Sequence, residues 1–255
     1  MGKIYMIGAM KGGTSKTCTV FNLAYSLQKL GKKVLCVDLD PQSNLTTCFG
    51  VEDADVTIGD LMMAVIEEDE LPEREEYIWE RNGVELIPGA MSLSAVEAKL
   101  RLEMGTERML ARILNPLKDE YDYILVDTAP TLGALNINAM SAADAVIVTV
   151  NPQLLAMKGL EDFLKTVKKI KSRVNEKLEI SGILLTMCEA RTNLCKTITE
   201  QVEETFRGQV RIFGSKIPST VKVGESVYYS EPLLEYAPNS AACKAYERLA
   251  EEVVA

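Results

Sequence analysis

The segment AMKGGTSKTCT (residues 9–19) combines two glycines with lysine and hydroxyl side chains, and it directly follows the apolar run KIYMIGA. A strand that leads through a glycine-bearing loop into Lys-Thr and a helix is the context of a phosphate-binding loop. In such a loop, backbone N–H groups and the helix N-terminus hold phosphate oxygens. Lys16 would reach the β- and γ-phosphates of a nucleotide, and the Thr17 hydroxyl would bind Mg²⁺. Gly12 and Gly13 would supply N–H donors.

Two positions depart from the usual form of this loop. Ser15 stands where glycine normally precedes the lysine, and Met10 replaces the first glycine. If position 15 requires a positive φ, a side chain there costs about 1–3 kcal/mol. Bound triphosphate could offset this cost, so we expect Ser15 to weaken the motif without cancelling it. For the loop alone, a glycine-rich turn with a chance Lys-Thr pair is the alternative interpretation.

Three carboxylates follow apolar runs elsewhere in the chain. Asp38 and Asp40 end VLCVDLD, and Asp127 ends YDYILVD. If both runs are strands of a parallel sheet, these acids lie at the edge where the phosphate loop also lies. Carboxylates there can hold Mg²⁺ and orient an attacking water. A single acid after an apolar run is usually a strand-end cap, but three beside such a loop favour a metal–nucleotide site.

Composition excludes several other kinds of chemistry. The 255 residues contain no histidine, and none of the six cysteines forms a CxxC pair. Zinc-ligand spacing and Ser-His-Asp or Cys-His catalysis are therefore absent. The net charge of −9 argues against a broad basic face for nucleic acid. No apolar run reaches the roughly 18 residues of a membrane helix, and the N-terminus lacks the layout of a signal peptide. We expect a cytoplasmic protein.

Strand-like and helical patterns alternate along the chain. This alternation predicts an α/β fold in one domain (1–255), with a mostly parallel twisted sheet and helices on both faces. Residues 52–82 form an acidic stretch, which we interpret as a helical insertion with a solvated surface on the rim of the sheet. Pro116 should end or kink its helix near Asn115. The expected strands are 3–9, 33–40, 83–89, 121–128, 144–150 and 179–187, and the expected helices are 19–31, 91–118, 134–143, 155–174 and 192–206.

The motifs together resemble the ParA/Soj family of P-loop ATPases, whose deviant Walker A loop has the form KGGxGKT. The resemblance covers nearly the whole chain in order and spacing. It is carried by KGGTSKT, VLCVDLDPQSNLT, YDYILVDTAPTLGALNINAMSAAD, GILLTMCEARTNL, KIPSTVKVGES and PLLEYAPNSAACKAYERLAEEV. The loop of a short, Soj-like member would follow directly on a first strand at Lys3.

The resemblance implies a role for each site residue. Two subunits would sandwich two ATP molecules, with Lys11 reaching the partner's phosphates and Lys16 binding those of its own subunit. Thr17 would ligate Mg²⁺ directly, Asp38 and Asp127 would support it through water, and Asp40 would position the attacking water. Without an intersubunit role, Lys11 is still attractive as an exposed lysine beside anionic phosphate. The implied nucleotide contacts are Lys11, Gly12, Gly13, Thr14, Ser15, Lys16, Thr17, Cys18 and, around adenine, Met187, Ile217 and Pro218.

The resemblance also implies a task. ATP-bound dimers would bind DNA without sequence preference, and a ParB-like partner would stimulate slow hydrolysis and release them from the nucleoid. Plasmid, chromosome or mobile-element DNA would thereby be segregated or positioned. Arg191 and Lys222 match the DNA-contact regions, with Lys196 as a possible helper, and the lysine-rich helix 165–177 is a competing patch.

Several positions differ from the family pattern. Ser219 and Lys222 replace arginines linked to DNA, which puts DNA binding in more doubt than ATP binding. Cys18 replaces a threonine, Lys158 stands where glutamate is common, and Glu189 where aspartate is common.

Three alternatives differ in their requirements. A membrane-bound MinD-type ATPase needs a basic amphipathic tail, but CKAYERLAEEVVA has no basic face, so no membrane partner is expected. A nitrogenase-reductase-type protein needs cluster-binding cysteines, and none closely follows Asp127. A nucleotide-gated adaptor or positioning protein with little or no ATP turnover stays open, because Ser15 alters the loop.

Overall fold

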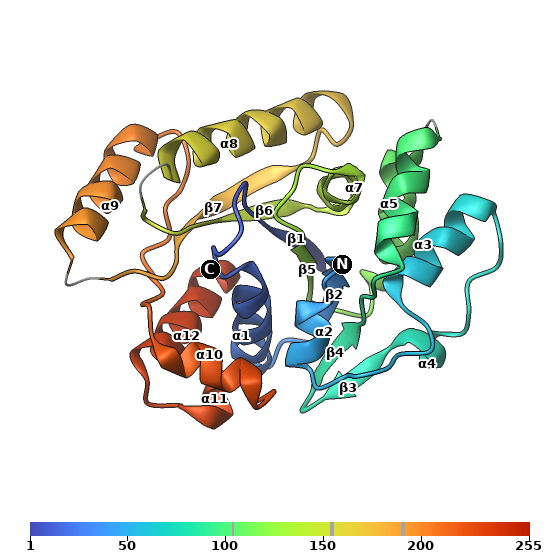
Figure 1. Ribbon diagram of the computed structural model, residues 1–255, viewed down its shortest axis with the longest axis horizontal. Helices are drawn as coiled ribbons and strands as arrows, with labels where there is room; N and C mark the ends of the chain where they lie inside the picture. The colour runs from blue at the N-terminus through green and yellow to red at the C-terminus, as the bar shows by residue number, and fades with distance from the viewer. Residues whose placement is uncertain (104, 154–155, 190–191) are drawn as a thin grey trace.

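One sheet forms the centre of the molecule. The computed structural model describes residues 1–103, 105–153, 156–189 and 192–255, and its seven-stranded sheet has the order β3-β4-β2-β5-β1-β6-β7 (Figure 1). The named strands pair in parallel except β3 with β4. The predicted mostly parallel α/β sheet is therefore confirmed. The strands are β1 (Lys3–Gly8), β2 (Val34–Leu39), β3 (Trp79–Arg81), β4 (Val84–Ile87), β5 (Tyr123–Thr128), β6 (Ala145–Val150) and β7 (Glu179–Leu185).

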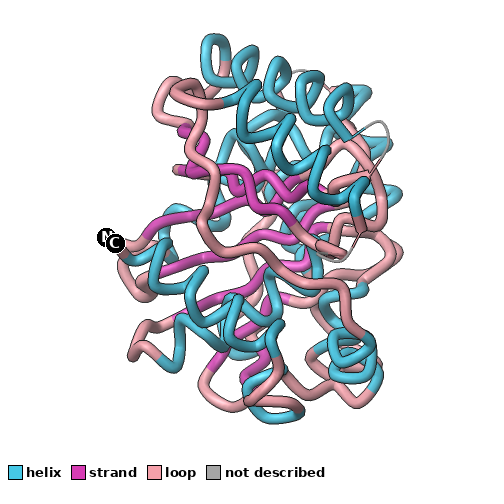
Figure 2. The backbone as a smooth tube through the Cα atoms, turned by 90° about the vertical axis from the view of Figure 1, so that its left-hand side faces the viewer, coloured by secondary structure: helices cyan, strands magenta, loops and turns pink. Residues whose placement is uncertain are grey.

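Helices cover both faces of this sheet, and Figure 2 shows the strands as a layer between them. The helices are α1 (Lys16–Lys29), α2 (Asn44–Cys48), α3 (Ile58–Glu67), α4 (Arg74–Tyr77), α5 (Leu93–Leu102), α6 (Met109–Leu117), α7 (Ala134–Ala142), α8 (Ala156–Arg173), α9 (Asn193–Phe206), α10 (Val221–Tyr228), α11 (Leu233–Tyr236) and α12 (Ala241–Val254). One core lies between the sheet and helices α1, α2, α11 and α12, with α10 at its margin. The other core lies between the sheet and helices α3 and α5 to α9.

The central strands read as continuous apolar runs because both of their faces are buried. In β5, Tyr123 and Leu125 belong to the core beneath α1, whereas Ile124 and Val126 belong to the core on the other face. This alternation follows from the two-residue period of a strand. It orients β2 and β5 so that the acids at their carboxyl ends emerge at one edge.

Helix α1 is the most enclosed helix next to the predicted loop. Ten of its fourteen residues are buried. It ends at Lys29, and Gly31 follows with a φ of 76° and donates its N–H to the Gln28 carbonyl. Gly31 is therefore the helix stop that the sequence predicted, since the left-handed conformation costs glycine little.

The predicted helix over 91–118 is wrong in its continuity. The chain forms α5, a 3-10 turn at Thr106–Arg108, and α6. Gly105 has a φ of 79°, and the Thr106 hydroxyl donates to the carbonyls of Leu100 and Glu103, which stabilises the break. Pro116 lies in the last turn of α6, which ends one residue later, close to the predicted end.

The acidic stretch 52–82 is more than a solvated helical insertion. It contains α3, α4 and β3, and β3 extends the sheet as an antiparallel edge strand that the sequence analysis missed. Ile58, Leu61 and Met62 of α3 are fully buried in the core, so only the other side of this helix carries the acidic surface. The strand was missed because WER has no alternation of its own and pairs only through β4.

No helix in the described part of the chain has both the length and the apolar character needed to cross a membrane.

A close backbone approach beneath β2 gives a test of this packing. A Cβ atom at Gly89 would lie 2.5 Å from the Asp38 carbonyl oxygen. We expect Gly89→Ala to lower the free energy of unfolding by about 2 kcal/mol, because backbone must move. Urea denaturation measures this, with Gly224→Ala in α10 as the control, since nothing lies within 4 Å of its added Cβ. Equal stability of the two variants would contradict the packing.

Candidate functional site

The predicted phosphate loop connects β1 to α1 at the carboxyl edge of the sheet. Gly12 and Gly13 are exposed, and Gly13 has a φ of 73°. Ser15 has φ 56° and ψ 33°, so it occupies the left-handed region at the start of α1. The condition for strain at this position is therefore met, because L-residues avoid this region at a cost of about 1–2 kcal/mol. The side chain of Ser15 makes no capping hydrogen bond that would offset the strain.

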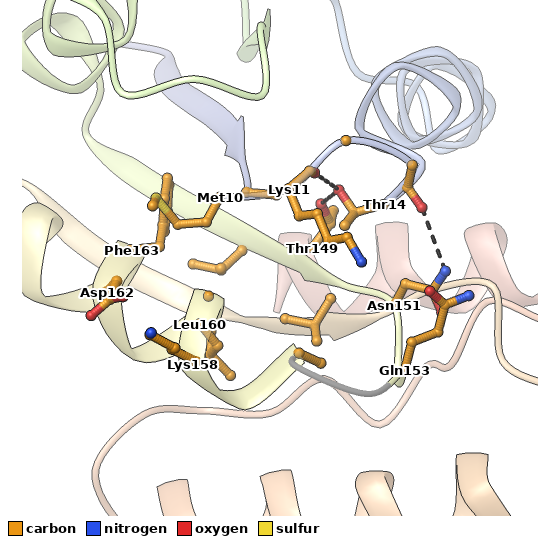
Figure 3. Close-up of a pocket in the computed structure, with 17 residues that line it drawn as sticks. Met10, Lys11, Thr14, Thr149, Asn151, Gln153, Lys158, Leu160, Asp162 and Phe163 are labelled. Carbon is orange, nitrogen blue, oxygen red and sulfur yellow. Dashed lines mark hydrogen bonds between the residues drawn. The ribbon is translucent and has the colours of Figure 1, made fainter.

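Thr14 fixes the loop to the rest of the sheet. The Thr149 hydroxyl, from β6, donates to Thr14 Oγ1 at 3.1 Å (Figure 3). The Thr186 hydroxyl, just after β7, donates to the Thr14 carbonyl at 3.0 Å. Sequence reasoning missed both anchors, although each is a lone threonine at the end of an apolar strand. They hold the loop in a fixed position, so that its N–H groups need no rearrangement to meet an anion.

Lys16 is the first residue of α1, and only 8% of it is exposed. Burial lowers the pKa of its ammonium group, while the charges of Asp127 and Asp40 act in the opposite direction. A buried lysine is costly unless an anion compensates it. The exposed N–H groups of the loop and this buried cation together favour a phosphate group at this position.

Asp38 and Asp127 form a buried pair beneath the loop. They are directly opposite each other in the parallel pairing of β2 and β5, and both are fully buried. Thr17 Oγ1 donates to Asp127 Oδ2 at 2.6 Å. Asp38 Oδ2 accepts from the N–H and the hydroxyl of Thr46, at 2.8 and 2.7 Å. The structure thus brings together the three predicted magnesium residues, and it adds Thr46, which the sequence did not reveal.

Burial and mutual repulsion raise the pKa of both acids. The pKa of Asp127 rises to about 7, first because of burial and then because of the Asp38 charge. The pKa of Asp38 rises to about 6, chiefly through burial, although its hydrogen bonds from Thr46 act against the increase. A divalent cation would remove this repulsion.

Oxygen ligands of this kind are those that Mg²⁺ prefers. Thr17, Asp38 and Asp127 therefore fit a magnesium site in which phosphate oxygens and water complete the coordination. Within the described ranges, no cluster of three or more acidic, cysteine or histidine side chains forms a metal site on protein ligands alone.

Asp40 continues from β2 into the next loop. Its Oδ1 accepts the Gln42 N–H at 3.0 Å, and its side chain is buried. Its charge acts on Lys16, so the two side chains belong to one site. Cys18 is half-buried one turn inside α1, and burial raises the pKa of its thiol to about 11.

The two segments predicted to surround a base lie side by side. Cys188 pairs with Pro218 in a parallel bridge, and the Cys188 N–H donates to the Ile217 carbonyl at 2.9 Å. Met187 has a φ of 52° and is 38% exposed, whereas Ile217 is buried. Asn151, which sequence reasoning missed, reaches both Met187 Sδ at 3.6 Å and the Gly13 carbonyl at 3.5 Å. These contacts connect the segments to the phosphate loop.

A cavity of about 360 Å³ opens between the loop and α8. Met10 and Lys11 line it from the loop, and Lys158 and Phe163 line it from α8 (Figure 3). Lys11 is exposed at its margin, unlike the buried Lys16. The two lysines of the motif therefore differ in surroundings, with one enclosed and one free to move.

The residues predicted to bind DNA lie apart from this loop. Lys222 is exposed on α10, where its Nζ lies 2.9 Å from Glu225 Oε2 and 5.4 Å from the centre of the Tyr236 ring. Its charge is therefore partly neutralised within the same helix, which the sequence analysis did not anticipate. Arg191 lies outside the described residues.

A parallel sheet, a glycine-bearing loop leading into Lys16 and Thr17, and paired acids on the neighbouring strands define a P-loop nucleotide-binding protein. A family model for the AAA domain matches residues 2–180. The sporulation initiation inhibitor protein Soj of Bacillus subtilis is 38% identical over all of this chain and 99% of its own length. The chromosome partitioning protein ParA of Myxococcus xanthus is 33% identical, over all of this chain and 88% of its own.

A solved structure is similar as well. Cobyrinic acid a,c-diamide synthase from Mycobacterium smegmatis, with a bound ATP analogue and magnesium, has a TM-score of 0.84 and 27% identity over all of this chain and 95% of its own. The chain belongs to the ParA/Soj-type partitioning ATPases of the AAA-domain family.

The left-handed backbone at Ser15 gives one prediction. Ser15→Gly should bind Mg-ATP at least as tightly as the parent and gain up to about 1 kcal/mol in free energy of unfolding. Isothermal titration and urea denaturation measure the two effects. The control is Ser172→Gly inside α8, which should lose about 0.5 kcal/mol because glycine weakens a helix interior. Markedly weaker nucleotide binding by Ser15→Gly would show that the hydroxyl contacts phosphate or metal.

The buried acid pair gives a pH prediction for the protein without metal or nucleotide. Between about pH 4 and 7 the native state holds a proton on Asp127 that the unfolded chain has released, so stability falls as the pH rises through this range. Asp127→Asn removes this dependence. Its gain in free energy of unfolding should therefore be small at pH 4 and reach about 1–3 kcal/mol at pH 8.

Urea denaturation across this pH range tests the effect, with the exposed Asp119→Asn as the control. A gain that is constant with pH, or equal in the control, would exclude a raised pKa at Asp127.

Proposed function

We propose that this chain binds ATP and Mg²⁺, dimerises around them, and couples slow hydrolysis to the segregation or positioning of plasmid, chromosome or mobile-element DNA. A ParB-like partner would stimulate hydrolysis. The observation that carries the proposal is the buried Lys16 beside the Asp38–Asp127 pair, under a loop of exposed N–H groups. Membership of the partitioning ATPases and the ATP analogue and magnesium in a similar structure support it.

Each residue has a defined task in this mechanism. The N–H groups of Gly12, Gly13 and the start of α1 bind phosphate oxygens, and Lys16 binds the β- and γ-phosphates. Magnesium, when bound, neutralises phosphate charge, and Thr17 supplies a hydroxyl ligand while Asp38 and Asp127 support it from below. Asp127 must release its proton for this role, and the positive charge of the metal favours that release. Asp40 orients the attacking water.

Lys11 is proposed to act in the dimer. Its side chain is exposed at the margin of the cavity and makes no ion pair in the part of the chain that the structure describes. It is therefore free to reach phosphates bound by a second subunit. Met187, Ile217 and Pro218 would enclose adenine, since their segments are joined to each other and, through Asn151, to the loop.

A second function is favoured by one observation. Strain at Ser15 raises the free energy of the loop, so the chain could bind nucleotide and a partner yet turn over very little ATP. Steady-state release of phosphate, with and without DNA and a ParB-like partner, separates such a nucleotide-gated adaptor from an ATPase. A rate that stays at the background level under all conditions supports the adaptor.

Substitution of three residues tests the assigned roles. Lys16→Ala should abolish ATP binding in isothermal titration. Lys11→Ala should bind ATP but fail to dimerise, because it retains the loop and loses the intersubunit cation. Asp40→Ala should dimerise with ATP and hydrolyse it at least about tenfold more slowly, since one catalytic positioning group contributes about 10²–10⁴.

Sedimentation with ATP and phosphate-release assays give the results. Lys158→Ala, which removes a different lysine at the same cavity, is the control for Lys11. Normal dimerisation of Lys11→Ala would exclude the intersubunit role, and normal ATP affinity of Lys16→Ala would exclude the phosphate site.

A further inference from the structure

Helix α8 carries a concentration of positive charge on a protein whose net charge is −9. Its apolar side, which includes Leu160, Phe163 and Val167, packs into the core. The opposite side and the turn after the helix expose a set of cations that we call the basic stripe. The stripe consists of Lys165, Lys168, Lys169, Lys171, Arg173 and Lys177, all of them at least partly exposed.

The charges of this stripe are largely uncompensated. No acidic residue occurs between positions 163 and 175. Among the described residues, the ion pairs of the stripe consist of one, between Lys165 and Asp162 at 3.4 Å. Lys222 differs, because Glu225 lies 2.9 Å from its ammonium group. The stripe therefore offers more free positive charge to an anionic polymer than α10 does.

We propose that the basic stripe of α8 is the surface through which this protein binds the phosphate backbone of duplex DNA. This inference rests on the proposed function and assigns its DNA contact to residues other than Lys222 and Arg191. From Lys165 to Arg173 the helix covers about 12 Å, a length over which each DNA strand presents about three to four phosphates, at about 3.4 Å each. The exposed side bears no aromatic or amide groups suited to reading bases, so the contact is independent of sequence.

The shape and composition of α8 favour DNA over a lipid surface. No large apolar side chain is exposed in the described stretch 156–177, so the stripe has nothing to insert between lipid acyl chains. The apolar side of the helix is already occupied by the core. A second copy could in principle offer its acidic stretch 52–82 to the stripe, and sedimentation separates that case from DNA binding.

The test compares two double charge reversals in the full chain with Mg-ATP. Lys168→Glu/Lys169→Glu changes the stripe, and Lys3→Glu/Lys33→Glu makes the same change in charge at the amino edge of the sheet, where both lysines are exposed. Fluorescence anisotropy on random duplex across a salt series gives the affinity.

The stripe variant should bind at least about tenfold more weakly than the control variant. Its salt slope should be shallower by about 2, at ~0.9 for each phosphate that the variant no longer neutralises. ATP turnover without DNA should be unchanged.

Each other outcome overturns the inference in a recognisable way. If the parent binds DNA and the two double variants lose affinity equally, only the overall charge matters and the stripe is not the contact. If Lys222→Ala loses more affinity than the stripe variant, the DNA surface lies on α10 and the proposed function stands. If the parent dimerises with ATP but binds no DNA at low salt, both the stripe assignment and the DNA part of the proposed function fail.

Two further measurements distinguish other partners. Binding of the parent to vesicles containing anionic phospholipid, abolished in the stripe variant, would replace DNA by a lipid surface. Salt-sensitive self-association in sedimentation without DNA, abolished in the same variant, would assign the stripe to a second copy. The urea midpoint of the stripe variant should match the parent, since the substituted side chains are exposed.

Discussion

Two carboxylates buried opposite each other, Asp38 and Asp127, are the constraint on which this site depends. Without a cation, two neighbouring acids at the buried end of a sheet repel each other and resist ionisation, which is why their pKa values rise. Thr46 and Thr17 stabilise them by donating hydrogen bonds. The site is therefore arranged for a state in which positive charge is bound. Some stability of the empty protein is given up for this, as is common where a binding site is preformed.

The loop above these acids has a similar tension. Ser15 adopts a backbone conformation that suits glycine, and Lys16 is enclosed although it is charged. Both costs are acceptable if an anion binds, because the loop N–H groups and the lysine then find their partner. Thr149 and Thr186 keep the loop in place through Thr14 while it waits for that anion. Strain, buried charge and fixed geometry thus occur together at one edge of the sheet, and the rest of the fold is ordinary close packing.

Charge is distributed unevenly around this centre. Acidic residues gather at the edge that carries α3, α4 and β3, while α8 exposes lysines in a stretch without acids. The Lys222 position, by contrast, is neutralised by Glu225. Surface electrostatics of this kind affect encounter with charged partners more than they affect the fold. A chain with an overall negative charge can therefore still have one face that attracts a polyanion.

The sequence by itself determined the central strands, the helix α1, the phosphate loop and the three acids of β2 and β5. These are local signals: continuous apolar runs, a glycine stop, and polar residues at strand ends. It did not determine β3, the break between α5 and α6, or the burial of α3, because these depend on an edge partner, a turn at Gly105 and a core assembled from distant segments.

The same limit explains the partners within the site. Thr46 meets Asp38, Thr149 and Thr186 meet Thr14, and Glu225 meets Lys222 only once the chain has folded. Residue types and spacing specify which groups can do chemistry. Which groups hold them in place, and which charges are cancelled, is decided by tertiary contacts, since hydrogen bonds and ion pairs act over a few ångströms and not along the sequence.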